Sequence, residues 1–311
     1  MNSDKTCIPD ENSLYAEFLQ RHSIISTPLV QCEAPAIYWT VRTKLEIDHD
    51  LGNHVDTLSQ ADPVWALLRS MLDRTFEYAE GAISAYVTGS TAASEVISRT
   101  VIESATNLLF ILVDERNGNH LTQYLSHYFN NEEKEIDKWL KLVDSLTDDI
   151  KEAHQAAALQ KRTALVSLKN YVNQALSELK LPTTDQVTQK WLSIAERFRL
   201  LGLELDYRTV YAALCSQSHN DAEDLLNYFV FVSLGNQDLL DKIALETVNF
   251  SRLMMYTGVK YYILAAGGYA ARFELNNALQ GVSQGREAIL EESERIANEL
   301  VQQPNNSPGA D

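Results

Sequence analysis

The chain of 311 residues is long enough for one large domain or two small ones, and its hydrophobic content of 45% is sufficient for a real core. Its 43 acidic and 26 basic residues give a net charge of −17 at pH 7, which disfavours general binding to nucleic acids or anionic membranes unless a local basic patch overrides the average field. Three widely spaced cysteines form no CxxC pair, and the N-terminus shows no secretory signal, so we expect a cytoplasmic protein.

The first part of the chain, residues 1–60, mixes prolines with a short β-branched and aromatic run at 37–45. This composition favours an irregular N-terminal arm with one short strand. From residue 61 to 303, in contrast, apolar residues recur at intervals of three and four, and the signals of β-hairpins are missing. The sequence therefore predicts an all-α protein, a multi-helix bundle over residues 61–303 that follows an irregular arm. The tail at 304–311 is expected to be disordered.

The predicted helices of the bundle follow one another with few breaks, because Pro182 is the only proline between residues 64 and 303. In chain order they run over residues 63–79, 91–114, 121–146, 147–180, 185–201, 206–218, 221–234, 237–271 and 286–301.

For two of these helices the sequence must be examined for exposure, one to solvent and one to a membrane. The helix at 147–180 is rich in Ala, Lys, Glu and Gln, so it either projects at the surface or forms a dimer contact. The apolar stretch at 253–271 contains Lys260 and three glycines, and it falls short of the roughly 20 unbroken apolar residues that cross a bilayer. We therefore expect a buried core helix there and no membrane contact.

A polar stripe runs through the apolar surface of the helix at 91–114. Arg99, Glu103 and Asn107 follow one another at i, i+4 positions. A buried charge must be paired, because an isolated one costs several kcal/mol. Arg99 and Glu103 either pair with each other and with carbonyl groups, which holds helices in register, or they line an internal cleft. In the cleft, Arg99 would bind an anionic group and Glu103 would orient it or move a proton, with Asn107 as a ligand-binding residue.

A second candidate segment contains Tyr211, Ser216 and His219. On a helix Tyr211 and His219 share one face, and Ser216 and His219 are neighbours. His219 either shuttles a proton near neutral pH or merely hydrogen-bonds a helix end, while Tyr211 and Ser216 either bind a ligand or belong to the core. No Gly-x-Ser-x-Gly elbow accompanies the Ser–His pair, so a hydrolase triad is not predicted.

Metal and cofactor chemistry finds little support in the sequence. The seven histidines contain no His-x3-His pair of the kind that a helical metal site uses, and glycine-rich phosphate loops are missing. We therefore expect no metal and no cofactor.

The Arg-x3-Glu pattern at Arg99 and Glu103, with the later Tyr-x4-Ser-x2-His pattern that ends at His219, resembles a mostly bacterial family of all-helical proteins of unknown function. The resemblance covers residues 63–234. That family is in turn distantly similar to the HEPN helical bundles, many of which are metal-independent ribonucleases in toxin–antitoxin and phage-defence systems. The resemblance implies catalytic or RNA-contacting roles for Arg99, Glu103 and His219. The chain departs from the HEPN pattern, because Arg208 stands too far before His219 for the closely spaced Arg–His motif.

Two hypotheses about function follow, and whether the chain is an enzyme stays open between them. The first is a HEPN-like ribonuclease or defence effector that acts on RNA, with Arg99 and His219 meeting within one chain or across a homodimer. The second is a non-enzymatic helical binding or regulatory module, which would engage a protein partner through its acidic surface and its exposed helix. A small-molecule sensor that uses the polar stripe fits the same residues.

Overall fold

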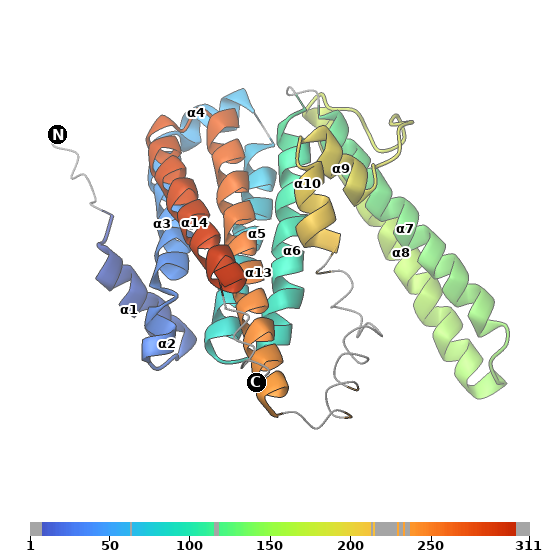
Figure 1. Cartoon of the computed structure of the whole chain (residues 1–311). Helices are drawn as coiled ribbons and strands as arrows, with labels where there is room; N and C mark the ends of the chain where they lie inside the picture. Colours follow the sequence, from blue (N-terminus) through green and yellow to red (C-terminus); the bar gives the residue numbers. More distant parts are fainter. Residues whose placement is uncertain are drawn as a thin grey trace. The chain divides into compact units, whose positions relative to one another are not determined.

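The computed structural model describes residues 8–62, 64–114, 118–212, 214, 229, 233 and 237–302, and all regular secondary structure in these ranges is helical. The prediction of an all-α protein is confirmed. The chain falls into two compact units, which we call the bundle unit (residues 1–109 and 197–311) and the hairpin unit (residues 110–196). The helices of both units are labelled in Figure 1.

The N-terminal residues form four helices instead of an irregular stretch. They are α1 (Glu11–His22), α2 (Pro28–Gln31), α3 (Ala34–Gly52) and α4 (Val55–Ala61). The expected strand at 37–45 is wrong, because these residues lie inside α3, where Ile37 and Val41 are buried one helical turn apart. The division of the chain at residue 61 stays a prediction, while α1 and α3 pack against each other and α3 also packs against helices from the C-terminal part of the bundle unit.

The prediction of irregular structure for residues 1–60 was wrong because two of the prolines there lie at the starts of helices. Pro28 is the first residue of α2, and Pro35 lies in the first turn of α3. The first turn of a helix tolerates proline, since its backbone N–H would lack an intrahelical partner in any case. The α1 start is fixed by Asp10, whose carboxylate accepts a hydrogen bond from the Ser13 backbone N–H at 2.9 Å.

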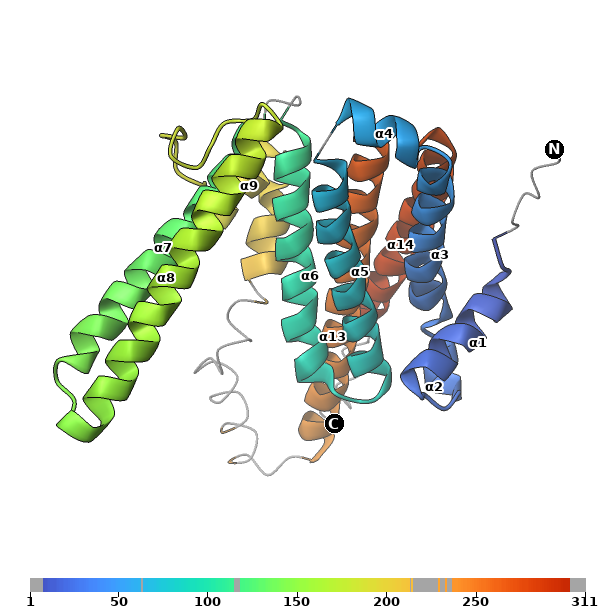
Figure 2. The ribbon, with the colours of Figure 1, turned by 180° about the vertical axis from the view of Figure 1, so that it is seen from behind.

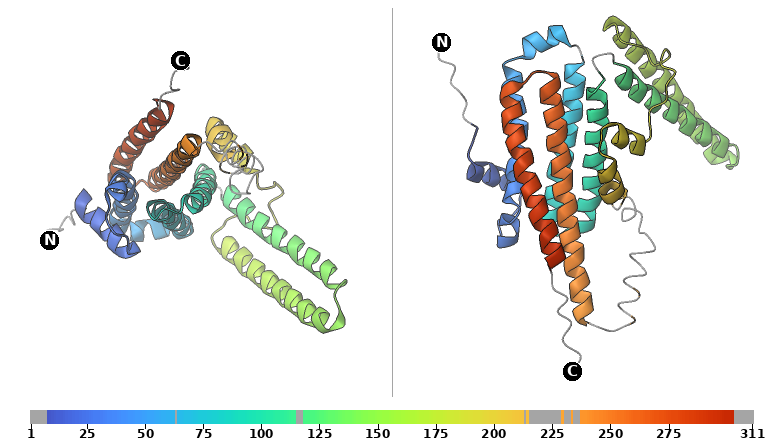
Figure 3. Two further views of the ribbon diagram at one scale, coloured as in Figure 1. Left: turned by 60° about the horizontal axis from the view of Figure 1, so that its bottom comes forward. Right: turned by 45° about the horizontal axis from the view of Figure 1, so that its top comes forward.

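The rest of the bundle unit is built on long helices. These are α5 (Trp65–Val87), α6 (Thr91–Leu112), α13 (Gln237–Arg272) and α14 (Asn276–Gln302). The long α13 packs against α3, α5 and α14, and Figure 3 shows α13 (orange) and α14 (red) side by side. The helices α5 and α6 run next to each other in Figure 2. The hydroxyls of Thr75 on α5 and Ser104 on α6 lie 2.8 Å apart.

The apolar stretch at 253–271 is a core element, as predicted. Tyr256, Tyr261, Tyr262 and Tyr269 of α13 are all fully buried. No helix in the described ranges combines the length and the apolar character that crossing a bilayer requires. The last helix, α14, begins earlier than expected, because the Asp50 carboxylate of α3 accepts hydrogen bonds from the backbone N–H groups of Asn277 and Ala278 and caps the helix.

The hairpin unit is dominated by two antiparallel helices, α7 (Asn119–Val143) and α8 (Asp148–Glu178). Phe129, Ile136 and Leu165 form its small core. The predicted helix at 185–201 is wrong in its first half, because α9 covers only Ile194–Leu200. Ser193 and Glu196 exchange hydrogen bonds between side chains and backbone N–H groups, and this capping box starts the helix there.

Two further segments lead from α9 toward the candidate site. They are α10 (Glu204–Asp206) and a π-helical turn, η1 (Tyr207–Tyr211). The second half of the predicted helix at 206–218 and nearly all of the predicted helix at 221–234 lie outside the described residues.

Candidate functional site

The polar stripe of α6 has the form that its spacing predicts. Arg99, Glu103 and Asn107 are half-buried at successive i, i+4 positions. The neighbouring faces of the helix are apolar and fully buried, as Val101 and Leu108 show. The stripe therefore lies on a helix that is anchored in the core through Val101 and Leu108.

Tyr211 of η1 joins two residues of this stripe. Its hydroxyl donates a hydrogen bond to Oε2 of Glu103 at 3.0 Å, and the guanidinium carbon of Arg99 lies 5.6 Å from the centre of its ring. The Tyr211 side chain is only 4% exposed. The structure thus brings together three predicted site residues from two distant parts of the chain, through a hydrogen bond and a cation–π contact.

Asn107 makes a different contact. Its side-chain oxygen accepts a hydrogen bond from the guanidinium group of Arg197, which lies in α9 and is 5% exposed. The next residue, Phe198, is fully buried and packs its ring against Tyr207 and Tyr211, with ring centres 5.6 Å apart in both cases. This aromatic anchor fixes α9 and η1 beside the stripe.

Lys260 adds a third cationic group to this part of the bundle unit. Its Nζ lies 2.9 Å from Oδ2 of Asp206, and the Tyr261 hydroxyl donates to the same oxygen at 2.9 Å. Burial and the adjacent charge of Asp206 raise the pKa of Tyr261, so its hydroxyl keeps its proton. Because Tyr261 also contacts Phe198, the Asp206–Lys260 pair belongs to the same cluster as Tyr211.

The polar stripe continues toward the N-terminus of α6 at Glu95. This buried carboxylate accepts a hydrogen bond from the Ser251 hydroxyl of α13. The helices approach closely at this level, since a Cβ atom added to Gly258 of α13 would lie 3.5 Å from Ser98. We call the set Glu95, Arg99, Glu103, Asn107, Arg197, Asp206, Tyr211 and Lys260 the stripe cluster.

Four members of the stripe cluster were not predicted. Glu95 stands one step before Arg99 in the same i, i+4 series, so the spacing alone was sufficient to find it. Lys260 interrupts an apolar helix and thereby requires a counter-charge, although the sequence does not indicate that Asp206 supplies it. Arg197 gives no local signal, because its partner Asn107 is 90 residues away in the chain.

Two predicted residues, Ser216 and His219, lie outside the described residues. They follow Tyr211 closely in the sequence, so the chain attaches them to a residue of the stripe cluster. Arg208, on the other hand, is exposed and lies near Glu204 at 4.0 Å.

The residue types of the stripe cluster are ones that can bind anions and transfer protons. Guanidinium and ammonium groups attract phosphate and carboxylate groups, while a carboxylate paired with a phenol can accept or pass on a proton. Within the described residues, no group of three or more His, Cys, Asp and Glu side chains is arranged to hold a metal ion.

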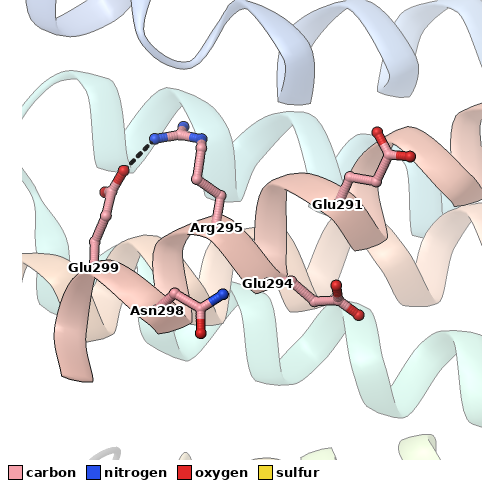
Figure 4. Close-up of a pocket in the computed structure, with 5 residues that line it drawn as sticks. All are labelled: Glu291, Glu294, Arg295, Asn298 and Glu299. Atoms are coloured by element: carbon pink, nitrogen blue, oxygen red, sulfur yellow. Dashed lines mark hydrogen bonds and ion pairs between the residues drawn. The ribbon is translucent and has the colours of Figure 1, made fainter. Parts of the chain in front are cut away.

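A hollow on the surface of α14 is an acidic helix face rather than a built site (Figure 4). Glu291, Glu294 and Glu299 line it, and Arg295 crosses it to pair with Glu299 at 2.5 Å. All the described residues that line it come from one helix, and it has no buried polar group that points to a ligand.

Fold and site together define an all-α bundle protein with a half-buried polar cluster on a central helix. The chain belongs to a family of unknown function, DUF5677, whose profile matches residues 61–237, more than half of the sequence. The predicted membership of a helical family of unknown function is confirmed. Searches of curated proteins and of solved structures give no significant match.

The residues that match the family profile include most of the stripe cluster. It contains the stripe itself together with Arg197, Asp206 and Tyr211, but it ends before Ser251 and Lys260 of α13. The core of the candidate site therefore lies in the part of the chain that the family shares.

Proposed function

We propose that the chain is a metal-independent ribonuclease of HEPN-like type whose active centre is the stripe cluster together with His219. The observation that carries the proposal is the contact of Tyr211 with both Arg99 and Glu103. It joins the Arg-x3-Glu helix to Tyr211, the first residue of the sequence pattern that continues to Ser216 and His219.

The stripe cluster is less acidic than the chain as a whole, whose net charge is −17. Its three cations, Arg99, Arg197 and Lys260, balance its three carboxylates, Glu95, Glu103 and Asp206. Charges separated by more than about 10 Å are screened at moderate ionic strength, so the acidic residues elsewhere in the chain act weakly here. Arg99 is the residue that we propose to contact a phosphodiester.

The reaction we propose uses the 2′-hydroxyl of RNA. His219 removes the 2′-hydroxyl proton, the 2′-oxygen bonds to phosphorus, and the bond from phosphorus to the 5′-oxygen breaks. The leaving 5′-oxygen receives a proton from a second acid, for which Glu103 with the Tyr211 hydroxyl is the candidate. Arg99 stabilises the negative charge that develops on the phosphoryl oxygens. The products are a 2′,3′-cyclic phosphate and a 5′-hydroxyl, and no oxidant or reductant is required.

Expression in a bacterial host tests the proposal. We expect the wild-type chain to slow growth and degrade total RNA, and Arg99→Ala and His219→Ala to abolish both effects. Arg208→Ala and His154→Ala are matched controls, because both side chains are exposed and neither belongs to the stripe cluster. Equal RNA degradation by all five proteins, or intact RNA with every one of them, would refute a ribonuclease centre at this place.

The alternative, a non-enzymatic binding or regulatory module, rests on a separate observation in the hairpin unit. The long helix α8 exposes apolar side chains, among them Ile150, Leu168 and Tyr171, the last at 72%. Such a face suits a protein partner. This function predicts that Tyr171→Ala removes the cellular effect while Arg99→Ala leaves it unchanged in proteins of equal thermal stability, the reverse of the ribonuclease pattern.

A further inference from the structure

The helix α8 carries two series of residues that repeat every seven positions. The first series consists of Ala158, Leu165 and Val172. It faces α7, since Leu165 belongs to the small core of the hairpin unit and Val172 packs against that core. The second series, one residue earlier in the chain, consists of Ala157, Ala164 and Tyr171, and all three side chains are exposed. Each such series is a surface on which another helix can pack, and α7 covers only the first.

Contacts between the two helices show which residues of α7 lie beside the second series. Lys161 follows Ala157 by one helical turn, and its Nζ lies 2.7 Å from a carboxylate oxygen of Glu132 on α7. The hydrogen bond to Glu132 raises the pKa of Lys161, and the charges of Tyr128 and Glu135 raise it further. All three residues of α7 therefore lie around Lys161, on the same side of the hairpin as the second series.

This side of the hairpin has exposed apolar side chains on both helices. We call it the hairpin face, and we define it by Tyr128 and Leu142 of α7 and by Ala157, Ala164, Leu168 and Tyr171 of α8. Leu142 belongs to it because it repeats the position of Tyr128 after fourteen residues, and Leu168 repeats that of Lys161 after seven. In the described range of α7, Tyr128 and Leu142 are the large apolar side chains that are exposed.

The opposite face of the hairpin is different in character. The ion pair of Arg162 with Asp137 joins the two helices there, one residue away from Lys161 on α8. The exposed Leu159 and Val166 of α8 lie on that side, without an exposed large apolar partner on α7. Only the hairpin face therefore offers two adjacent helices to a partner.

We propose that the hairpin face binds the same face of a second copy of this chain, so that two hairpins form a four-helix bundle. The face extends over about 20 residues of each helix, or about 30 Å, and two packed helices are about 20 Å wide. Each copy thus contributes roughly 600 Å², and the total of roughly 1,200 Å² reaches the range of specific interfaces. Closed two-fold pairing of identical faces is the commonest form of protein self-association.

The charges beside the hairpin face fit a second copy better than a partner of opposite charge. Glu132 pairs with Lys161 at 2.7 Å. Glu135 pairs with Lys138, also at 2.7 Å. These four charges cancel, although the chain as a whole has a net charge of −17. Two copies can therefore meet at this face without the repulsion of their acidic surfaces, whereas a basic partner would find no net negative charge there.

The second series also determines the direction of the pairing. In a parallel pair of α8 helices, each Lys161 would face its own copy, and like charges opposite each other are destabilising. In an antiparallel pair centred on Ala164, the large Tyr171 lies opposite the small Ala157 of the second copy, which suits close packing. We therefore place Ala164 near the two-fold axis.

Sedimentation equilibrium of the purified full chain tests the dimer. We expect a particle of twice the chain mass of 35.0 kDa. Leu168→Glu and Tyr171→Glu should each raise the dissociation constant of the dimer at least about 100-fold, because each places a charge in an apolar contact. Val166→Glu is the matched control, since Val166 is 47% exposed on the opposite face and Leu168 is 46% exposed. It should associate like the wild type.

Oxidative cross-linking tests the register. The three native cysteines are first replaced by serine. Ala164→Cys should then form a disulfide-linked dimer, because the two copies of this position meet near the axis. Ala156→Cys, also at an exposed alanine of α8, should not, since its two copies would lie about 24 Å apart. Equal cross-linking at both positions would contradict the antiparallel register.

Three results would overturn the proposal. One is a wild-type chain that stays monomeric at about 100 µM, which would leave the hairpin face to a different protein. The others are a dimer that neither Leu168→Glu nor Tyr171→Glu weakens, and a dimer that Val166→Glu weakens equally. Circular dichroism should show equal helical content in all variants, because each changed side chain is exposed in the single chain. None of these measurements involves RNA, so the dimer and the ribonuclease centre are tested separately.

Discussion

Two regions of the bundle unit contain buried charges, and the described contacts hold them in different ways. On the side of α1, α3 and α5, cations meet anions: Arg69 pairs with Asp48 and Asp73, and Arg21 pairs with Glu80. The stripe cluster also contains an ion pair, Lys260 with Asp206, but the described contacts of Glu103 include a phenol and those of Arg197 an amide. A hydrogen bond to a neutral partner can be exchanged for a ligand at smaller cost than a cation–anion pair between helices. We therefore expect the first region to serve stability and the polar stripe of α6 to serve function.

The largest expected effect is a loss of RNA cleavage when the stripe cluster, but not the first region, is altered. Glu103→Gln should lower the rate of RNA cleavage by about 10²- to 10⁴-fold, because the carboxylate no longer takes part in proton transfer. The thermal midpoint should change little, since glutamine can still accept the Tyr211 hydrogen bond. Cleavage of a labelled RNA by Glu103→Gln and by Arg69→Met, measured per folded molecule, gives the comparison. Equal losses in both variants would remove the distinction between the regions.

The next effect concerns stability. Arg69 is a buried cation that bridges Asp48 and Asp73, and its removal leaves both carboxylates without this partner. Arg69→Ala should lower the free energy of unfolding by about 1–3 kcal/mol, less than for a fully buried pair, because the two carboxylates are partly exposed and both still pair with Lys44. Denaturant unfolding measures it, with Arg74→Ala as the control on an exposed position of the same helix. A change below that of the control would show that the pair contributes nothing to the fold.

The stability of the first region should also depend on pH, through the carboxyl group of Glu80. Burial raises the pKa of this carboxyl from 4.5 to about 7, and the nearby Arg21 only partly opposes the shift. Between these values the folded chain holds a proton that the unfolded chain has released, so stability falls as pH rises from about 4.5 to 7.

Glu80→Gln should remove this loss. From near pH 5 to near pH 8, wild type should lose about 1–3 kcal/mol more unfolding free energy than the variant. His22, which faces Glu80 at 3.8 Å, has a pKa lowered by burial and acts in the opposite direction below pH 6.5, but it is present in both proteins. Parallel stability curves of the two proteins would contradict the raised pKa.

The smallest effect is expected in the hairpin unit. Arg162 of α8 pairs with Asp137 of α7, and both side chains are well exposed. Arg162→Ala should change the free energy of unfolding by about 0.5 kcal/mol or less, because water and salt screen such pairs. A loss of 2 kcal/mol or more, measured by thermal or denaturant unfolding, would show that exposed pairs also secure this fold.

The fold was largely predictable because local patterns determine it. The apolar periodicity placed α6, α7, α8 and α13 within about three residues of their observed bounds, as the prediction at 91–114 and the helix Thr91–Leu112 illustrate. It made α5 too short, because the predicted helix ends at residue 79 and the observed one ends at Val87. The N-terminal helices were missed because prolines at helix starts were taken as signs of irregular structure, and the start of α9 was missed because the Ser193–Glu196 capping box was overlooked.

Only those residues of the candidate site that lie on one helix could be predicted from the sequence. The spacing of Arg99, Glu103 and Asn107 is visible in the sequence, because all three lie on one helix. The partners Arg197 and Asp206 come from other helices, and pairing across such distances depends on tertiary packing that periodicity does not encode. In the hairpin unit, the amide pair of Gln123 and Gln189 was not predicted for the same reason, since its members are 66 residues apart in the chain.

The most direct measurement is the chemistry of the RNA ends left by the purified chain in the presence of a chelator. The account predicts fragments that end in a 2′,3′-cyclic phosphate and a 5′-hydroxyl, and their absence with Arg99→Ala and with His219→Ala at unchanged helical content. Uncut RNA after incubation with the wild-type chain, or equal amounts of such fragments from wild type and both variants, would contradict a ribonuclease centre at the polar stripe of α6.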